Sequence, residues 1–234
     1  MKTLDELKKE IQKFQTVDNL EQIFNDIFAS PEATNEEKRL HEGQHGRLFK
    51  TAAEELDPLI VWLKIRMPDA SARLVLGNQN YDAEVSQGAE NPIRLEIGLA
   101  IDGYQDRLLK EAISKDGHGS PNSTYERVGN GKEKTVKATN SRITAPSNSI
   151  AKKCADQIDQ IAKAKSAKGY DSATILILAQ MDDFAIRGES LDILKSCSEK
   201  ILESYNWPVN KVDIIGKKNG LLASKYNSSK PPKN

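Results

Sequence analysis

The chain has 234 residues, 38% of them hydrophobic, which is enough for one large domain or two small ones with a buried core. Lys and Arg number 34, as do Asp and Glu, so the net charge is zero and gives no global attraction to a nucleic acid. No apolar run approaches the roughly 20 residues that span a bilayer, and the N-terminus lacks the apolar core of a signal peptide. We therefore expect a cytoplasmic protein without membrane contact.

Charge is distributed unevenly along the chain. Residues 1–60 carry 8 basic and 13 acidic side chains, whereas residues 101–170 carry 13 basic and 8 acidic ones. A nucleic acid is therefore expected to meet residues 101–170.

The N-terminal part is expected to be helical. Apolar residues recur at helical spacing in residues 4–15, and Asp18 with Glu21 has the spacing of a capping box before a second apolar stripe. A third helical start follows at Asn35. Residues 1–45 thus form a helical N-terminal extension, which we expect to pack on the body, on a second copy in a homodimer, or on a protein partner.

Residues 46–226 are expected to form an α/β domain. Helical spacing continues over residues 47–56, and Asp57-Pro58 is typical of an N-cap followed by proline at the first helical position. Three short strands and a helix that begins at Gly103 come next. The expected strands are residues 72–76, 81–85 and 93–101.

Residues 116–148 have a different composition. Gly, Ser, Asn and charged residues dominate this segment, and large apolar residues are few. Asn130-Gly131 lies between residues typical of strands and predicts an exposed hairpin. We expect the remainder to be a mobile basic loop.

The C-terminal half alternates helices with strands. An amphipathic helix begins near Ile150, with Cys154 on its apolar stripe and Lys165 interpreted as lying away from that stripe. The continuous apolar run 174–181 is typical of a strand buried on both faces. Further elements are expected at residues 190–205, 212–215 and 221–226, before a disordered tail at 227–234.

This order of elements predicts a mixed α/β sheet with helices on both faces. Successive strands pair as hairpins, while strand–helix–strand units favour parallel neighbours. Cys154 and Cys197 fall on apolar faces of the expected helices. We interpret both as buried free thiols in a reducing compartment.

Acidic side chains on two adjacent strands are the main candidate site. Alternation places Asp82 and Glu84 on one face of their strand, and Arg94, Glu96 and Gly98 on one face of the next. A carboxylate in an apolar strand costs free energy unless it is paired or bound to a metal. Glu96 could form an ion pair with Arg94 or a lysine, or face solvent. Alternatively, Asp82 and Glu96 could hold a Mg²⁺ ion that activates water and stabilises charge at a phosphate.

The order of a helix, a strand carrying Asp82, a strand carrying Glu96 and a further helix resembles the core of the restriction-endonuclease-like PD-(D/E)xK nuclease superfamily. The resemblance covers residues 47–114, with residues 173–181 as a candidate further core strand. It implies Mg²⁺-dependent hydrolysis of phosphodiesters, with Asp82 and Glu96 as the metal ligands.

The chain departs from this family pattern at two positions. Gly98 stands where the motif has its lysine, and Tyr81 stands where the motif has proline. Such folds can supply the lysine from the next helix, and Lys110 is then the expected catalytic lysine. Otherwise the site has lost its chemistry and the fold only binds nucleic acid.

His41, Glu42 and His45 match the pattern HExxH and resemble the zincin metalloproteases. On a helix, the two histidines would bind zinc and Glu42 would act as the base. Gly43 and Gly46 weaken a helix here by about 1 kcal/mol each, and no expected strand precedes the motif. A solvated helix junction is the preferred interpretation.

His118 and nearby basic residues are the candidate nucleic-acid contacts. His118 could contact a substrate beside a metal–phosphate site, or be an exposed loop histidine. The basic side chains could follow a phosphate backbone, although neighbouring acidic residues dilute their charge. These basic residues are Arg127, Lys132, Lys134, Lys137 and Arg142.

The preferred hypothesis is a Mg²⁺-dependent nuclease acting on DNA or RNA, or an inactive nuclease-like domain that binds nucleic acid. The alternative is a non-enzymatic interaction module that docks through the N-terminal helices, and a zinc metallopeptidase is third. Asp182-Asp183, at the end of the buried strand, could bind a metal or ligand, but a helix-capping or turn role is the preferred interpretation.

Overall fold

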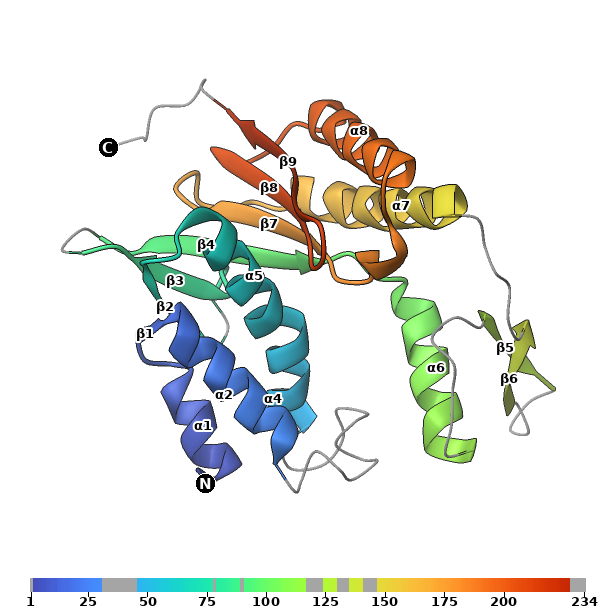
Figure 1. The fold of residues 1–234 in the computed structure, drawn as a ribbon, viewed down its shortest axis with the longest axis horizontal. Coiled ribbons are helices and arrows are strands. Elements are labelled where there is room, and N and C mark those ends of the chain that lie inside the picture. Colours follow the sequence, from blue (N-terminus) through green and yellow to red (C-terminus); the bar gives the residue numbers. More distant parts are fainter. Residues whose placement is uncertain are drawn as a thin grey trace.

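The computed structural model describes residues 2–30, 46–77, 79–88, 91–116, 124–129, 135–140 and 147–227. Within these residues, seven strands form one mixed sheet in the order β1-β2-β3-β4-β7-β8-β9, and β5 and β6 form a separate pair. Helices cover both faces of the larger sheet (Figure 1), so the expected mixed α/β fold is confirmed. The helical start at Asn35, the motif of His41, Glu42 and His45, and residues 228–234 lie outside the described residues.

The N-terminal helices pack on the body of the protein. Helix α1 (Leu4–Glu10), strand β1 (Gln15–Thr16) and helix α2 (Val17–Ala29) follow one another. Leu7, Leu20 and Ile27 are buried in the same hydrophobic core as side chains of the central strands, and β1 pairs antiparallel with β2. The described N-terminal residues therefore share the sheet and core of the α/β domain.

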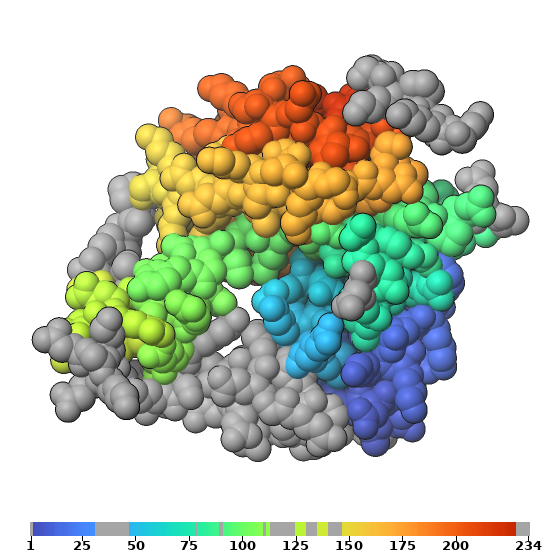
Figure 2. Space-filling model, turned by 180° about the vertical axis from the view of Figure 1, so that it is seen from behind, coloured from blue at the N-terminus to red at the C-terminus, as the bar shows by residue number. Residues whose placement is uncertain are grey.

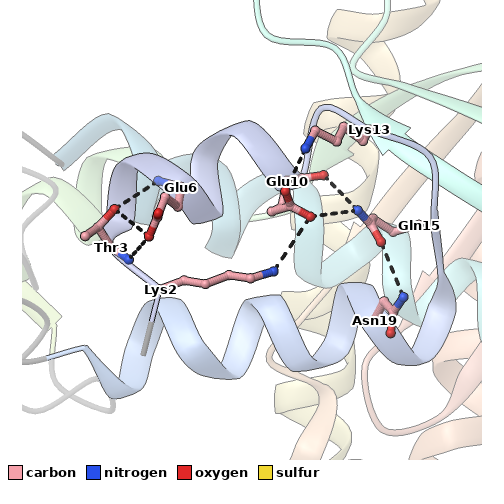
Figure 3. Close-up of polar contacts among 7 residues, drawn as sticks. All are labelled: Lys2, Thr3, Glu6, Glu10, Lys13, Gln15 and Asn19. Carbon is pink, nitrogen blue, oxygen red and sulfur yellow. Dashed lines mark hydrogen bonds and ion pairs between the residues drawn. The ribbon is translucent and has the colours of Figure 1, made fainter.

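Polar side chains close the N-terminal ends of both helices. Thr3 and Glu6 form a capping box on α1, in which the Glu6 N–H donates to Thr3 Oγ1 at 3.3 Å (Figure 3). Helix α2 is capped by Thr16, which accepts from the Asn19 N–H at 3.4 Å. The expected capping box at Asp18 is therefore wrong, because Asp18 already lies inside the helix.

One continuous helical segment follows the gap in the described residues. It comprises α4 (Gly46–Thr51), the π-helical turn η2 (Ala52–Leu56) and α5 (Asp57–Arg66). Pro58 lies in the first turn of α5, directly after the π-helical turn, and its missing N–H removes one hydrogen bond from the continuous helical segment at this point. Asp57 is not an N-cap as expected, since Leu56 already has helical dihedral angles; Asp57 instead accepts from Lys217 Nζ at 2.5 Å.

The central strands lie close to their expected positions. Antiparallel pairing joins β2 to β3 and β3 to β4, whereas β7 is parallel to both β4 and β8. Their bounds are β2 (Ser71–Leu74), β3 (Ala83–Ser86), β4 (Ile93–Leu99), β7 (Ile175–Gln180), β8 (Lys211–Gly216) and the edge strand β9 (Gly220–Tyr226).

Alternation along β7 separates two hydrophobic cores. Ile177 packs toward the N-terminal helices, whereas Leu176 and Leu178 pack toward α7 (Ser147–Ser166) and α8 (Glu189–Ser204). Burial of β7 on both faces explains its uninterrupted apolar sequence. No helix among the described residues is long and apolar enough to cross a bilayer.

Helix α6 (Gly103–Asp116) and the hairpin of β5 (Thr124–Val128) and β6 (Thr135–Asn140) stand beside the main body (Figure 1). They have a small core of their own, which includes Leu108 and Tyr125. The Gln105 side chain holds the hairpin by accepting from the Tyr125 N–H at 2.8 Å and donating to the Tyr125 carbonyl at 3.1 Å. The expected hairpin is confirmed, while its turn at Asn130-Gly131 lies outside the described residues.

Asp183 anchors the turn between β8 and β9. It is fully buried and accepts from the backbone N–H groups of Lys218 and Asn219 at 2.8 and 2.9 Å. Gly216 leaves room for it, since a Cβ there would lie 2.9 Å from the carboxyl carbon of Asp183 and closer still to one carboxylate oxygen. The expected turn role is therefore confirmed for Asp183.

Substituting Gly216 by alanine is expected to lower the free energy of unfolding by about 3 kcal/mol, because the methyl group would displace a buried, hydrogen-bonded carboxylate. Chemical denaturation measures this loss. Gly169→Ala is the matched control, since a Cβ at Gly169 meets no atom within 4 Å. Equal stability of the two variants would contradict the role assigned to Asp183.

Candidate active site

The candidate site lies where β3 and β4 separate. Their pairing ends at Ala83 and Leu95, just after the Asp82 N–H donates to the Leu95 carbonyl at 2.8 Å. The next N–H on that edge of β4, from Ile97, donates to the Asp82 carboxylate at 2.8 Å. The side chain of Asp82 thus replaces a strand partner and lies against the backbone of β4, beside Glu96.

Glu96 points toward the face of the sheet covered by α7. It is 8% exposed and forms an ion pair with Lys165 of α7, while the Tyr170 hydroxyl donates to it at 3.2 Å. Lys165 Nζ also donates to the Ile97 carbonyl at 3.1 Å. Of the interpretations of Glu96, the ion pair with a lysine is confirmed, whereas Arg94 pairs with Asp171 at 3.1 Å instead.

Gly98 gives Lys165 its path to the site. A Cβ at Gly98 would lie 3.0 Å from Cγ1 of Ile161 and 3.1 Å from Cε of Lys165. The aliphatic part of Lys165 therefore crosses the strand at the glycine, on the same face as Glu96. A lysine from α7 occupies the space where the family motif has a side chain at position 98.

The lysine beside Glu96 differs from the expected one. Lys110 lies in α6, and its side chain is outside the described part of the structure. Lys165 was expected away from the apolar stripe of its helix, and this is wrong, because it is 8% exposed. Its spacing from Ile158 and Ile161 is that of residues on one helical face, and this signal could have identified it.

Glu55, on η2, is a further acidic group near Asp82. It was not predicted, because the sequence analysis considered acidic residues on adjacent strands only. Burial, together with the negative charges of Asp82 and Glu54, raises the pKa of Glu55 to about 7, against the opposing charges of Arg47 and Lys50. Single π-helical turns within α-helices occur frequently at functional sites.

The pKa of Asp82 is also raised, to about 6. Burial is the largest cause and the charge of Glu96 is the second, while the Ile97 N–H and the positive charge of Lys165 act in the opposite direction. Burial and the nearby Glu96 also raise the pKa of Tyr170, which keeps its hydroxyl protonated as a donor. The site therefore holds more negative charge than Lys165 compensates at neutral pH.

The oxygen atoms gathered here suit a hard divalent cation. Glu96 and the Ile97 carbonyl accept from Lys165, and the Asp82 carboxylate, which accepts from the Ile97 N–H, feels the positive charge of Lys165. The described residues contain no group of three His, Cys, Asp or Glu side chains arranged to hold a metal. Mg²⁺ needs no such group, since it commonly binds through one or two carboxylates, retained waters and substrate phosphates.

The other candidate residues lie elsewhere or outside the described structure. Glu84 accepts from Arg73 at 2.7 Å and from the Tyr81 hydroxyl at 3.0 Å, so it forms a separate pair. Arg127 pairs with Glu111 at 2.5 Å on the α6–hairpin unit, where Lys137 is exposed. The residues outside the described parts are His118, Lys132, Lys134 and Arg142.

The metal-free protein is expected to lose stability as the pH rises from about 4.5 to 7. The folded-state pKa values of Asp82 and Glu55 exceed their ordinary values, so the folded chain binds more protons than the unfolded chain in this window. This stabilisation is fully present below the unfolded pKa values and is lost as the pH passes about 6 and 7. Asp213 contributes to stability with the opposite sign and at lower pH. Its burial would raise its pKa, but hydrogen bonds from Arg66 and Ser224 lower it, so its contribution is lost as the pH falls below this window.

Glu55→Gln is expected to reduce this pH-dependent loss by about 1 kcal/mol, after allowance for solvent screening. Urea denaturation between pH 4.5 and 8 in a chelating buffer measures the difference. Glu199→Gln, at an exposed position of α8, is the control. Identical pH profiles for the wild type and Glu55→Gln would contradict the coupling of Glu55 to Asp82.

Comparisons of the chain with protein-family models, with curated proteins and with solved structures gave no match.

Proposed function

We propose that the protein is a Mg²⁺-dependent nuclease of the PD-(D/E)xK type, which hydrolyses phosphodiester bonds of DNA or RNA. The observation that carries this proposal is the convergence of Asp82, Glu96, the Ile97 carbonyl and Lys165 where β3 and β4 separate. Two carboxylates and a carbonyl could hold a divalent cation, and this cation together with the lysine would place positive charge around a phosphodiester.

The topology supports the same proposal. Helix α5 precedes the antiparallel strands β2, β3 and β4, and β7 then joins β4 in parallel. This order corresponds to the helix, the two acidic strands and the further core strand 173–181 on which the resemblance was based. In Figure 2 a gap is visible between α6 (green) and the α4–η2 segment (cyan).

Each side chain has a role in this proposal. Asp82, Glu96 and the Ile97 carbonyl would hold Mg²⁺, which when bound polarises a phosphate and lowers the pKa of water. Lys165 neutralises charge that develops on the phosphate, and Tyr170 orients Glu96. Glu55, whose negative charge is coupled to that of Asp82, would be the general base.

The cellular location belongs to the same proposal. Cys154 and Cys197 are free thiols, and Cys154 is buried. Free thiols support a reducing compartment such as the cytoplasm, where a nuclease would meet nucleic acids.

A cleavage assay tests the proposed function. Single- and double-stranded DNA and RNA are incubated with the protein in Mg²⁺, in Mn²⁺ and in EDTA, and the double variant Asp82→Asn/Glu96→Gln controls for contaminating nucleases. The expected result is metal-dependent cleavage by the wild type alone. Equal cleavage by the variant, or none by the wild type on any substrate, would overturn hydrolysis; retained binding without cleavage would instead indicate an inactive nucleic-acid-binding domain.

A further inference from the structure

A pocket beside the candidate site has not been assigned a role. Its volume is about 140 Å³, and it lies where α1, α4 and the chain after β2 meet. In Figure 2, α4 (cyan) and the region of β2 (teal) lie side by side on the visible face. The pocket is lined by Lys8, Arg47, Leu48, Thr51, Leu76 and Gly77.

The described lining of this pocket carries positive charge. Lys8 and Arg47 contribute two cations, and none of the lining residues that the structure describes is acidic. Within the described ranges, no ion pair involves either side chain, unlike Lys50 on the same helix, which pairs with Glu54 at 3.8 Å. Both cations are exposed, so an anion can reach them, and the guanidinium of Arg47 presents several N–H donors in one plane.

Two walls of the pocket continue into the candidate active site. Thr51 lies about one helical turn before Glu55, and the charge of Arg47 lowers the pKa of Glu55. On the other wall, Leu76 follows Val75, whose N–H donates to the Asp82 carbonyl at 2.8 Å. An anion in the pocket would therefore lie on the side of the sheet that carries Glu55, next to the chain segment that carries Asp82.

We propose that this pocket binds a phosphate group of the nucleic-acid strand, next to the phosphodiester that is cleaved. The proposal rests on the proposed function and adds how the strand is held. Arg47 and Lys8 supply charge-assisted hydrogen bonds to phosphate oxygens, and the pocket's small volume suits one phosphate group rather than a base stack. The phosphate is either the end of a strand or an internal link.

Binding without catalysis tests the pocket separately from hydrolysis. Fluorescence anisotropy measures the Kd of labelled single-stranded DNA carrying a 5′-phosphate, a 3′-phosphate or only hydroxyl ends, in EDTA and over a range of salt. Lys8→Ala/Arg47→Ala is expected to weaken binding about tenfold and to lower the slope of log K against log salt by about 1. Lys200→Ala, an exposed lysine on α8, is expected to change Kd less than twofold.

The outcomes separate the alternatives. A loss confined to one phosphorylated end identifies a terminal phosphate, and an equal loss for all three oligonucleotides identifies an internal one. If Lys8→Ala/Arg47→Ala leaves the Kd and the salt slope unchanged, the proposal that this pocket binds phosphate is overturned, even if the wild type cleaves nucleic acid. Arg47-dependent binding by a protein that never cleaves would support the pocket while hydrolysis fails.

Thermal unfolding distinguishes a lost phosphate site from a folding defect of the double variant. Inorganic phosphate is expected to raise the melting temperature of the wild type but not of Arg47→Gln, a single exchange at an exposed position. An equal rise in both proteins would count against the pocket.

Discussion

Lys165→Met is expected to reduce the kcat/KM of the proposed Mg²⁺-dependent hydrolysis by about 10²–10³-fold, because the substitution removes the cation beside Glu96 but keeps most of the apolar side chain. Lys163→Met is the matched control, since Lys163 is exposed on the same helix. Steady-state cleavage of a labelled oligonucleotide measures both variants. Activity within twofold of the wild type in Lys165→Met would remove Lys165 from the proposed chemistry.

The same variant has a second expected effect, on stability. Without Lys165, Glu96 remains buried with no cation, and the metal-free protein is expected to lose about 3 kcal/mol. Mg²⁺ would then replace the missing charge, so it should raise the melting temperature more in Lys165→Met than in the wild type. A smaller rise in the variant would argue that Lys165 helps to form a metal site rather than balancing its charge.

Placing a lysine at position 98, where the motif of the nuclease superfamily that the chain resembles has one, is expected to restore part of the proposed activity. In Gly98→Lys/Lys165→Ala, the new side chain extends from the face of β4 that carries Glu96, into space vacated by Lys165. Each single variant is expected to lose at least about 10²-fold in kcat/KM, and the double variant to regain about tenfold. The measurement is a double-mutant cycle on the cleavage rate.

The control for this exchange is Gly98→Met/Lys165→Ala, which fills the same space without a charge. It is expected to remain as inactive as Lys165→Ala. If it recovers activity as well as the lysine variant does, then packing over β4 rather than the ammonium group determines activity.

The strands and helices could be predicted largely from sequence because their signals are local. The uninterrupted apolar run of β7 predicts a strand that is buried on both faces. The alternation around Glu96 in β4 predicts a strand with one apolar face and one mixed face. Boundaries were less predictable where tertiary contacts decide them. Thr16 rather than Asp18 caps α2, and Asp57 reaches across to Lys217 instead of starting a helix.

The site was only half predictable, for a physical reason. Asp82 and Glu96 lie on strands that are neighbours in sequence, so their proximity follows from a hairpin-type pairing. Lys165 lies beside Glu96 and Glu55 lies near Asp82, and the two come from helices on opposite faces of the sheet. No local sequence pattern indicates which turn of a helix packs on which residue of a strand. The missing lysine at Gly98 was nevertheless informative, because it marks the space that Lys165 occupies.

The parallel pairing of β4 with β7 has a consequence for the order of folding. The two strands are separated in sequence by α6, the hairpin and α7, so their pairing closes a long loop and should form late. The local core of α6 with β5 and β6 can form earlier. Its formation shortens the flexible loop that remains between β4 and β7. Since Lys165 reaches Glu96 only when α7 docks on β4, a partly folded chain lacks the charge arrangement proposed for catalysis. A newly synthesised chain would thus acquire this arrangement only when its fold is complete.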